Sequence, residues 1–186
     1  MLAKIAIIAG YARSLINFRG ELIKEFIRYG HQVIAIAPEQ GFERRINSLG
    51  AQYCSIPLDR NGCNIFKDLF ALLSLWRKLK KEKPDVVLAY TVKPVIYGSL
   101  AARLNKTPHI YSMITGLGYA FSGNTLKHRI LAKVISFLYR QALKNNQKVF
   151  FQNPDDLHLF TSKKLVACSK TVLINGSGVD INSFSF

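Results

Sequence analysis

Seven short apolar runs, separated by segments with helical patterning, constrain the fold of this chain more than any other feature of its sequence. The runs are residues 3–9, 32–38, 51–57, 85–90, 109–115, 148–153 and 171–176. Most are apolar throughout, which is typical of strands covered on both faces of a sheet. The predicted helices between them are residues 17–29, 41–49, 64–83, 94–105, 124–146 and 154–162. This alternation predicts an α/β fold in which right-handed βαβ units build a mostly parallel sheet of about seven strands.

Residues that begin or end helices fall between the predicted elements. Gly30 follows the first predicted helix, and Pro84 separates the basic end of a helix from the next strand. Asn153 precedes Pro154 and two aspartates. Asn is a favoured N-cap, Pro a favoured first helical residue, and acidic side chains are stabilising near a helix N-terminus. The sequence therefore predicts that a helix begins at Pro154 with Asn153 as its cap.

Composition places the chain among ordered globular domains. It has 186 residues, of which 49% are hydrophobic, which suits one domain with a substantial core. The apolar run near the N-terminus lacks the basic flank and cleavage site of a signal peptide, so we interpret it as a first strand. No uncharged apolar run reaches about 18 residues, the length expected of a membrane-spanning helix. The three cysteines fit no metal-binding spacing, which favours reduced cytosolic thiols and predicts no metal site.

The charge of the chain is strongly positive and unevenly distributed. Lys and Arg total 26 against 11 acidic residues, a formal net charge of +15. From Val86 to Pro154 there is no Asp or Glu, although basic residues recur throughout that span. Such a field favours an anionic partner, which could be a nucleic acid, a phosphorylated substrate or an acidic lipid.

The carboxyl ends of the predicted strands are the expected place for a ligand, because open α/β sheets bind ligands there. After the first strand, a glycine permits close approach of backbone and an arginine opens the next helix, although a plain loop with a solvated arginine fits equally well. After the fourth strand, a lysine lies one residue before Pro94 and could reach a phosphate, or could simply be solvated. The candidate binding residues of these two loops are Gly10, Tyr11, Ser14, Arg19, Tyr90, Thr91 and Lys93.

Two further loops follow predicted strands. The loop after the fifth strand contributes Thr115, Gly116 and Gly118, whose backbone amides could bind an oxygen or a phosphate. The ending after the seventh strand is rich in glycine and is a weaker signal. Strands four to six bring no Asp or Glu to their ends, and His109 begins its strand, at the wrong edge for a general base. We therefore expect anion binding here rather than proton transfer, and we assign no catalytic residue.

The segment 124–148 is a predicted helix with an apolar stripe and a basic face. The stripe consists of Leu126, Ile130, Val134, Phe137 and Leu138, and the basic face of Arg129, Lys133, Arg140 and Lys144. One interpretation is a surface helix whose apolar side packs on the sheet. The basic face, with Tyr139 exposed at its margin, also suits an anionic membrane surface, at roughly 1 kcal/mol per basic residue near the bilayer. We predict both: packing by the stripe and membrane binding by the four basic residues.

Six segments together resemble a known family. In chain order they are IAIIAG, NFRGELIKEFIRYGHQVIAIAPE, PDVVLAYTVKPVIYGSLAARL, YSMITGLGYAF, KVFFQNPDD and VLINGSGVDINSF. They are similar to the N-terminal half of group-1 (family 4) bacterial glycosyltransferases with the GT-B fold. The resemblance implies a Rossmann-like three-layer α/β sandwich, one half of a GT-B fold, with an acceptor-binding domain at residues 1–174. It also implies that residues 175–186 are the stub of the interdomain linker, with Gly176, Gly178 and Asp180 as its hinge.

The resemblance carries expectations about activity and partners. Members of the family bind an acceptor, often a sugar linked to undecaprenyl diphosphate, in the N-terminal domain at the cytoplasmic membrane face. The nucleotide-sugar donor binds a C-terminal domain with a Glu-x7-Glu motif, and the sequence contains no such motif. Transfer is usually retaining and needs no metal, so no cofactor is expected. Relatives have a Gly-Gly pair after the first strand and a histidine near the end of the fifth, and both are missing here.

Three functional hypotheses remain. The first is the acceptor-binding half of a retaining hexosyltransferase that acts on a membrane glycan or polysaccharide acceptor, peripheral on the inner face of the cell membrane and inactive alone. The second is a non-catalytic subunit that recruits a separate donor-binding protein to the membrane. The third, which rests only on the net charge, is a basic α/β domain that binds nucleic acid. We favour the first, with no nucleic-acid partner.

Overall fold

The computed structural model describes residues 2–59, 64–116 and 125–178. Seven strands form one sheet in the order β3-β2-β1-β4-β5-β6-β7, and every neighbouring pair is parallel. The strands are β1 (Lys4–Ile8), β2 (Gln32–Ala37), β3 (Gln52–Ser55), β4 (Val86–Tyr90), β5 (His109–Ile114), β6 (Lys148–Phe151) and β7 (Thr171–Leu173). The predicted Rossmann-like α/β fold with seven strands is confirmed.

The helices match the predicted ones, except that two helices occupy the region of the first predicted helix. They are α1 (Ala12–Asn17), α2 (Gly20–Arg28), α3 (Glu43–Asn47), α4 (Ile65–Glu82), α5 (Val92–Leu104), α6 (Leu126–Leu143) and α7 (Pro154–Ser162), with a 3-10 turn at Cys168–Lys170. The single helix predicted at 17–29 is wrong in its start, because the chain breaks at Arg19 and a separate α1 precedes it. The cap at Asn153 is confirmed, since its side chain accepts a hydrogen bond from the Asp156 amide at 2.7 Å.

The helices cover the two faces of the sheet unequally. The helices α4, α5, α6 and α7 lie on one face, and their buried residues join the larger core. On the other face, α1, α2 and α3 pack over β1, β2 and β3. An apolar groove of about 400 Å³ lies over β4, β5 and β6 on that second face, with Leu22 and Phe26 of α2 on one side. Its lining includes Tyr111, Met113, Phe150 and Ile174.

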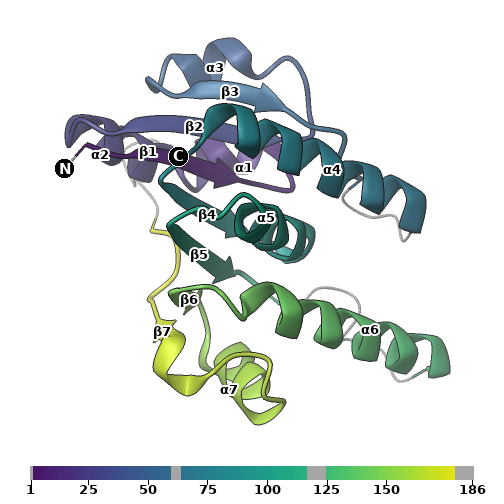
Figure 1. Ribbon diagram of the computed structural model, residues 1–186. Coiled ribbons are helices and arrows are strands. Elements are labelled where there is room, and N and C mark those ends of the chain that lie inside the picture. The colour runs from purple at the N-terminus through teal and green to yellow at the C-terminus, as the bar shows by residue number, and fades with distance from the viewer. Residues whose placement is uncertain (1, 60–63, 117–124, 179–186) are drawn as a thin grey trace, which may run out of the picture.

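The packing of α6 contradicts the prediction for its apolar stripe. Leu126 is 72% exposed and Phe137 is 58% exposed, so most of the stripe faces away from the sheet. The helix packs instead through its C-terminal half, where Ala142 and Leu143 are buried. Tyr139, predicted to be exposed, is also buried and lies edge-on to Phe160 at 4.9 Å between ring centroids. The physical reason is that α6 contacts α5 and extends beyond the sheet, so no helix or strand of the described residues packs against its first turns (Figure 1).

The helix α4, like α6, has exposed apolar side chains in its first turns. Its C-terminal half is buried through Leu75 and Leu79, whereas its first turns present exposed apolar side chains. Both helices begin beyond the carboxyl edge of the sheet, on either side of α5 (Figure 1). We call these ends the helix tips, defined as Ile65, Phe66, Leu69 and Phe70 of α4 and Leu126 and Ile130 of α6.

Candidate functional site

The loops after β1 and β4 are in direct contact at the carboxyl edge of the sheet. A Cβ atom added at Gly10 would lie 2.9 Å from Thr91 Oγ1 and 3.5 Å from Pro94, so this close approach requires glycine. Thr91 has φ 68° and ψ 164°, a strained conformation for a β-branched residue. A strained backbone therefore lies at the carboxyl edge of the sheet, where open α/β sheets bind ligands.

Tyr90 links this edge to α1. Its hydroxyl lies 2.8 Å from Ser14 Oγ, and Ser14 donates its own proton to the Tyr11 carbonyl at 2.6 Å. The single Ser14 hydrogen is thus committed, so Tyr90 donates to Ser14. Burial raises the pKa of Tyr90 to about 12, an effect that the Ser14 hydrogen bond and the nearby Arg19 partly oppose. The phenol is therefore a neutral donor at physiological pH.

Arg19 is a buried cation at the centre of the edge. It is 4% exposed, and its guanidinium lies 4.8 Å from the centroid of the Tyr90 ring. Nη1 donates to the Phe18 carbonyl and to Ser177 Oγ, and Nη2 lies 2.9 Å from Met113 Sδ. Nε is buried without a hydrogen-bond partner in the described part of the chain. The solvated arginine of the alternative interpretation is wrong.

The charge of Arg19 is not neutralised by any carboxylate within the described ranges. Burial lowers its pKa from the ordinary value, although an arginine remains protonated at physiological pH. A buried guanidinium without an anionic partner is unfavourable for folding unless another group compensates it. The uncompensated charge of Arg19 therefore favours the binding of an anion at this site.

Gln152 is a site residue that the sequence interpretation missed. It follows β6 directly, and its Nε2 atom lies 2.8 Å from Ser177 Oγ. Ser177 thus accepts hydrogen bonds from both Gln152 and Arg19. The available signal was a polar residue immediately after a buried strand, the same signal that singled out Tyr90 and Thr91.

Lys93 is engaged in an ion pair. Its Nζ lies 2.6 Å from Asp68 Oδ1 of α4, and both side chains are largely buried, at 15% and 17% exposure. It is thus neither solvated nor a free point charge. Asp68 also brings a carboxylate to the carboxyl edge from a helix, and Glu39 brings another from the loop after β2, where it accepts the Ala12 amide at 2.6 Å.

The remaining predicted residues are distributed as follows. Thr115 and Gly116 are half-buried directly after β5, and Gly118 lies outside the described residues. Gly176 and Gly178 have φ of +93° and +71°, which favours glycine, and Asp180 also lies outside the described residues. The structure thus brings Gly10, Tyr11, Ser14, Arg19, Tyr90 and Thr91 together, with Lys93 in the adjacent first turn of α5.

The four basic residues of α6 are all exposed. Arg129 and Lys133 are exposed near the helix tip. Arg140 donates to the carbonyls of Lys163 and Lys164 after α7, and Lys144 lies at the packed end of the helix. Arg129 and Lys133 lie close in sequence to exposed apolar side chains, and Arg140 lies three residues after the exposed Phe137. None of the helices in the described ranges combines the length and the hydropathy that a membrane-spanning segment requires.

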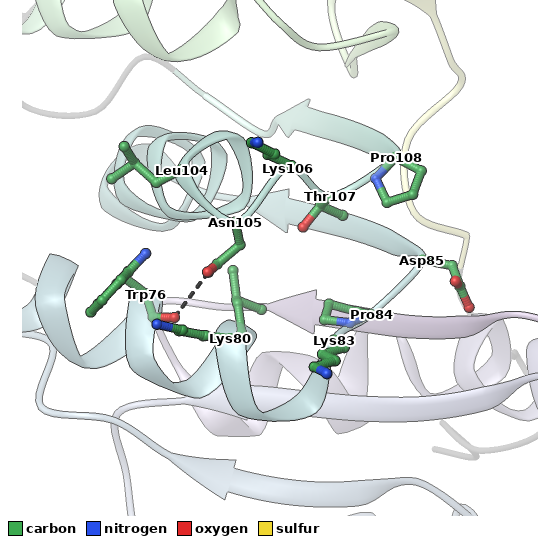
Figure 2. A pocket seen from close by; sticks show the side chains of 11 residues that line it. Trp76, Lys80, Lys83, Pro84, Asp85, Leu104, Asn105, Lys106, Thr107 and Pro108 are labelled. Atoms are coloured by element: carbon green, nitrogen blue, oxygen red, sulfur yellow. Dashed lines mark hydrogen bonds between the residues drawn. The ribbon is translucent and has the colours of Figure 1, made fainter.

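A second cavity lies at the opposite, amino edge of the sheet. It measures about 460 Å³ and is lined by the end of α4, the residues before β4 and those between α5 and β5. Figure 2 shows Trp76 on one side and Asn105 hydrogen-bonded to the Trp76 carbonyl at 2.9 Å. The ammonium groups of Lys83 and Lys106 point away from one another, so the hollow presents no convergent cationic site. Within the described chain, no group of three or more His, Cys, Asp or Glu side chains could hold a metal ion.

Comparison with known proteins identifies relatives of this chain. It is 23% identical over 181 residues to the N,N'-diacetylbacillosaminyl-diphospho-undecaprenol alpha-1,3-N-acetylgalactosaminyltransferase of Campylobacter jejuni, a match that covers 97% of this chain and 48% of that protein. It is 27% identical over 130 residues to the UDP-Gal:alpha-D-GlcNAc-diphosphoundecaprenol alpha-1,3-galactosyltransferase of Escherichia coli, covering 70% of this chain and 32% of that protein. The chain thus spans at most about half the length of these relatives.

Solved structures share the fold. The MurG structure from Acinetobacter baumannii matches with a TM-score of 0.61 at 20% identity, over 98% of this chain and 47% of that one. The UDP-GlcNAc 2-epimerase of Neisseria meningitidis matches with a TM-score of 0.62 at 18% identity, over 91% and 46%. The family described as "Glycosyl transferase 4-like" has a sequence profile that matches residues 5–153, most of the chain. The protein therefore belongs to the glycosyl transferase 4-like family.

Proposed function

We propose that this chain is the acceptor-binding half of a glycosyltransferase that moves a sugar from a nucleotide sugar to a glycan linked to a polyprenyl diphosphate. The observation that carries the proposal is Arg19, a buried cation without a carboxylate partner in the described residues, at the sheet edge where α/β folds bind ligands. A diphosphate supplies the missing negative charge. The relatives named above act on diphospho-undecaprenol-linked sugars, which matches this chemistry.

The donor is proposed to bind a second unit. The chain matches about half of its relatives, and the apolar groove over β4, β5 and β6 is a sheet face that another folded unit could cover. Transfer is proposed to be retaining, with a hexose-type sugar and no metal or other cofactor. Without the donor unit the chain is proposed to be inactive. The groove also favours the second candidate function, a non-catalytic subunit that recruits a donor-binding protein.

Equilibrium binding tests the acceptor assignment. The purified chain is titrated with a polyprenyl-diphosphate-linked N-acetylhexosamine in nanodiscs, and separately with UDP-sugars in solution. We expect saturable binding of the lipid-linked sugar and no binding of the UDP-sugars. Binding of a UDP-sugar with no affinity for the lipid-linked sugar would place the chain on the donor side and overturn the proposal.

Membrane association is proposed to occur through the helix tips rather than through the whole of α6. Exposed apolar side chains on both tips lie close in sequence to Lys67, Arg129 and Lys133. Each basic residue near an anionic bilayer contributes roughly 1 kcal/mol, and the apolar side chains add burial in the acyl boundary. The protein would then lie peripherally on the inner face of the cell membrane, with the carboxyl edge facing its lipid-linked acceptor.

Vesicle sedimentation tests the tips directly. The variant Phe66→Ser with Phe70→Ser should lose most of its binding to vesicles of phosphatidylglycerol. Leu104→Ser, which removes another exposed apolar side chain at the C-terminal end of α5, should bind as the wild type. Duplex DNA and RNA at matched salt should bind far more weakly than the vesicles. If both variants bind equally, or if nucleic acid competes fully, the membrane proposal fails.

A further inference from the structure

Two hydrogen-bond donors from distant parts of the chain converge on one hydroxyl oxygen. Arg19 Nη1, at the start of α2, and Gln152 Nε2, after β6, each lie 2.8 Å from Ser177 Oγ. Arg19 is held in place by the Tyr90 ring and by Met113. A guanidinium and an amide that converge in this way are the donors used to bind the oxygen of a phosphate or carboxylate.

Ser177 satisfies these donors only in part. Its hydroxyl is neutral, so it leaves the charge of Arg19 without an anion, and Arg19 Nε stays buried and unbonded within the described residues. Burial desolvates the charged form of Arg19, which lowers its pKa from the ordinary value. An anionic oxygen in the position of Ser177 Oγ would compensate that charge, which the hydroxyl does not do.

Few contacts hold the segment that carries Ser177 against the sheet edge. Asn175, Gly176, Ser177 and Gly178 are all exposed. Both glycines have positive φ, and no described atom lies within 4 Å of where their Cβ atoms would be. Apart from the two bonds to Ser177, little side-chain packing would be lost if this segment moved away from the edge.

We propose that Arg19 and Gln152 form an oxyanion site for a phosphoryl oxygen, and that Ser177 occupies this site until a diphosphate-bearing ligand displaces it. The inference rests on the proposed acceptor role and adds to it a coupling. Ligand binding frees the segment after β7, so the conformation of residues 175–178 responds to occupancy of the edge. Ser177 acts as an internal competitor for the site.

Binding of inorganic pyrophosphate to the 186-residue chain, followed by calorimetry, tests the site. Ser177→Ala removes the competitor and should tighten binding several-fold, whereas Gln152→Leu removes a donor and should weaken it about tenfold. Arg19→Met should abolish it. The matched controls are Ser162→Ala and Arg28→Met, an exposed serine on α7 and an exposed arginine on α2, and both should bind as the wild type.

Hydrogen exchange tests the coupling. Saturating pyrophosphate should speed the exchange of the Ile174 amide, which donates to the Phe151 carbonyl directly before this segment, and Ser177→Ala should show fast exchange there without ligand. Ser177 is exposed and Gln152 is half-exposed, so these variants should fold even if Arg19→Met does not, and circular dichroism verifies this. Unchanged affinity in both Ser177→Ala and Gln152→Leu, or equal weakening by Arg28→Met, would overturn the inference.

The outcomes separate this inference from the acceptor proposal. If pyrophosphate binds as described but the polyprenyl-diphosphate sugar does not, the oxyanion site stands and the acceptor class is wrong. If the lipid-linked sugar binds with the same affinity to the wild type, Ser177→Ala and Gln152→Leu, the acceptor role stands and the oxyanion site is wrong. Orthophosphate serves as a third probe. If orthophosphate binds as tightly as pyrophosphate, the site is one for free phosphate, and the coupling to a lipid-linked diphosphate is overturned.

Discussion

Replacement of Thr91 by glycine should stabilise the protein while weakening its ligand site. Thr91 has φ 68° and ψ 164°, a region that only glycine adopts readily. Strain of this kind costs about 1–3 kcal/mol, and glycine loses about 0.5–1 kcal/mol through the greater entropy of the unfolded chain. The difference predicts a gain of about 1 kcal/mol in the free energy of unfolding, or about 2–4 °C in Tm for a domain of this size.

Chemical denaturation measures this effect, with Thr107→Gly as the matched control. Thr107 does not have a positive φ, so its replacement relieves no strain and should lower the free energy of unfolding by about 0.5–1 kcal/mol. The same Thr91→Gly variant should bind pyrophosphate or the lipid-linked sugar more weakly, because the loop beside Gly10 loses its fixed shape. If Thr91→Gly is destabilised as much as the control, the strain argument is refuted.

Three further predictions concern the same edge. Gly10→Ala should lower the free energy of unfolding by about 1–3 kcal/mol in denaturation, because its Cβ would lie 2.9 Å from Thr91 Oγ1; an unchanged midpoint would contradict the close approach. Lys93→Met and Asp68→Leu should each lower the free energy of unfolding more than the double variant does, because the double variant leaves no unpaired charge. In this double-mutant cycle, additive losses would show that the two side chains are not coupled. The pKa of Tyr90 is raised from 10 to about 12, so the folded state favours the neutral phenol and the free energy of unfolding should fall as pH rises from 10 to 12. Denaturation at a series of pH values should show a smaller fall for Tyr90→Phe. An unchanged dependence of the free energy of unfolding on pH would contradict this prediction.

The sheet could be predicted from the sequence because buried parallel strands are apolar throughout, and all seven runs became strands. The same reasoning located much of the site. Residues that follow parallel strands meet at one edge, which placed Gly10, Ser14, Tyr90 and Thr91 together before any contact was known. These predictions need only the order of the strands along the chain.

The errors concern contacts that local patterns do not determine. Periodicity identified the apolar stripe of α6 but not what it faces, and the helix packs on α5 by its C-terminal half instead. The ion pair of Lys93 with Asp68 depends on two helix starts lying side by side, which no spacing encodes. The convergence of Arg19 and Gln152 on Ser177 likewise joins three distant segments.

The most direct test of the account is to map where the acceptor binds. Backbone amide shifts of the labelled chain are followed by NMR during titration with a short-chain polyprenyl-diphosphate-linked N-acetylhexosamine. We predict that the largest changes fall in the loops after β1, β4 and β6, around Gly10, Thr91 and Gln152. Changes centred on the amino-edge hollow around Trp76 and Lys106, with the carboxyl edge unaffected, would contradict the claim that this edge is the acceptor site.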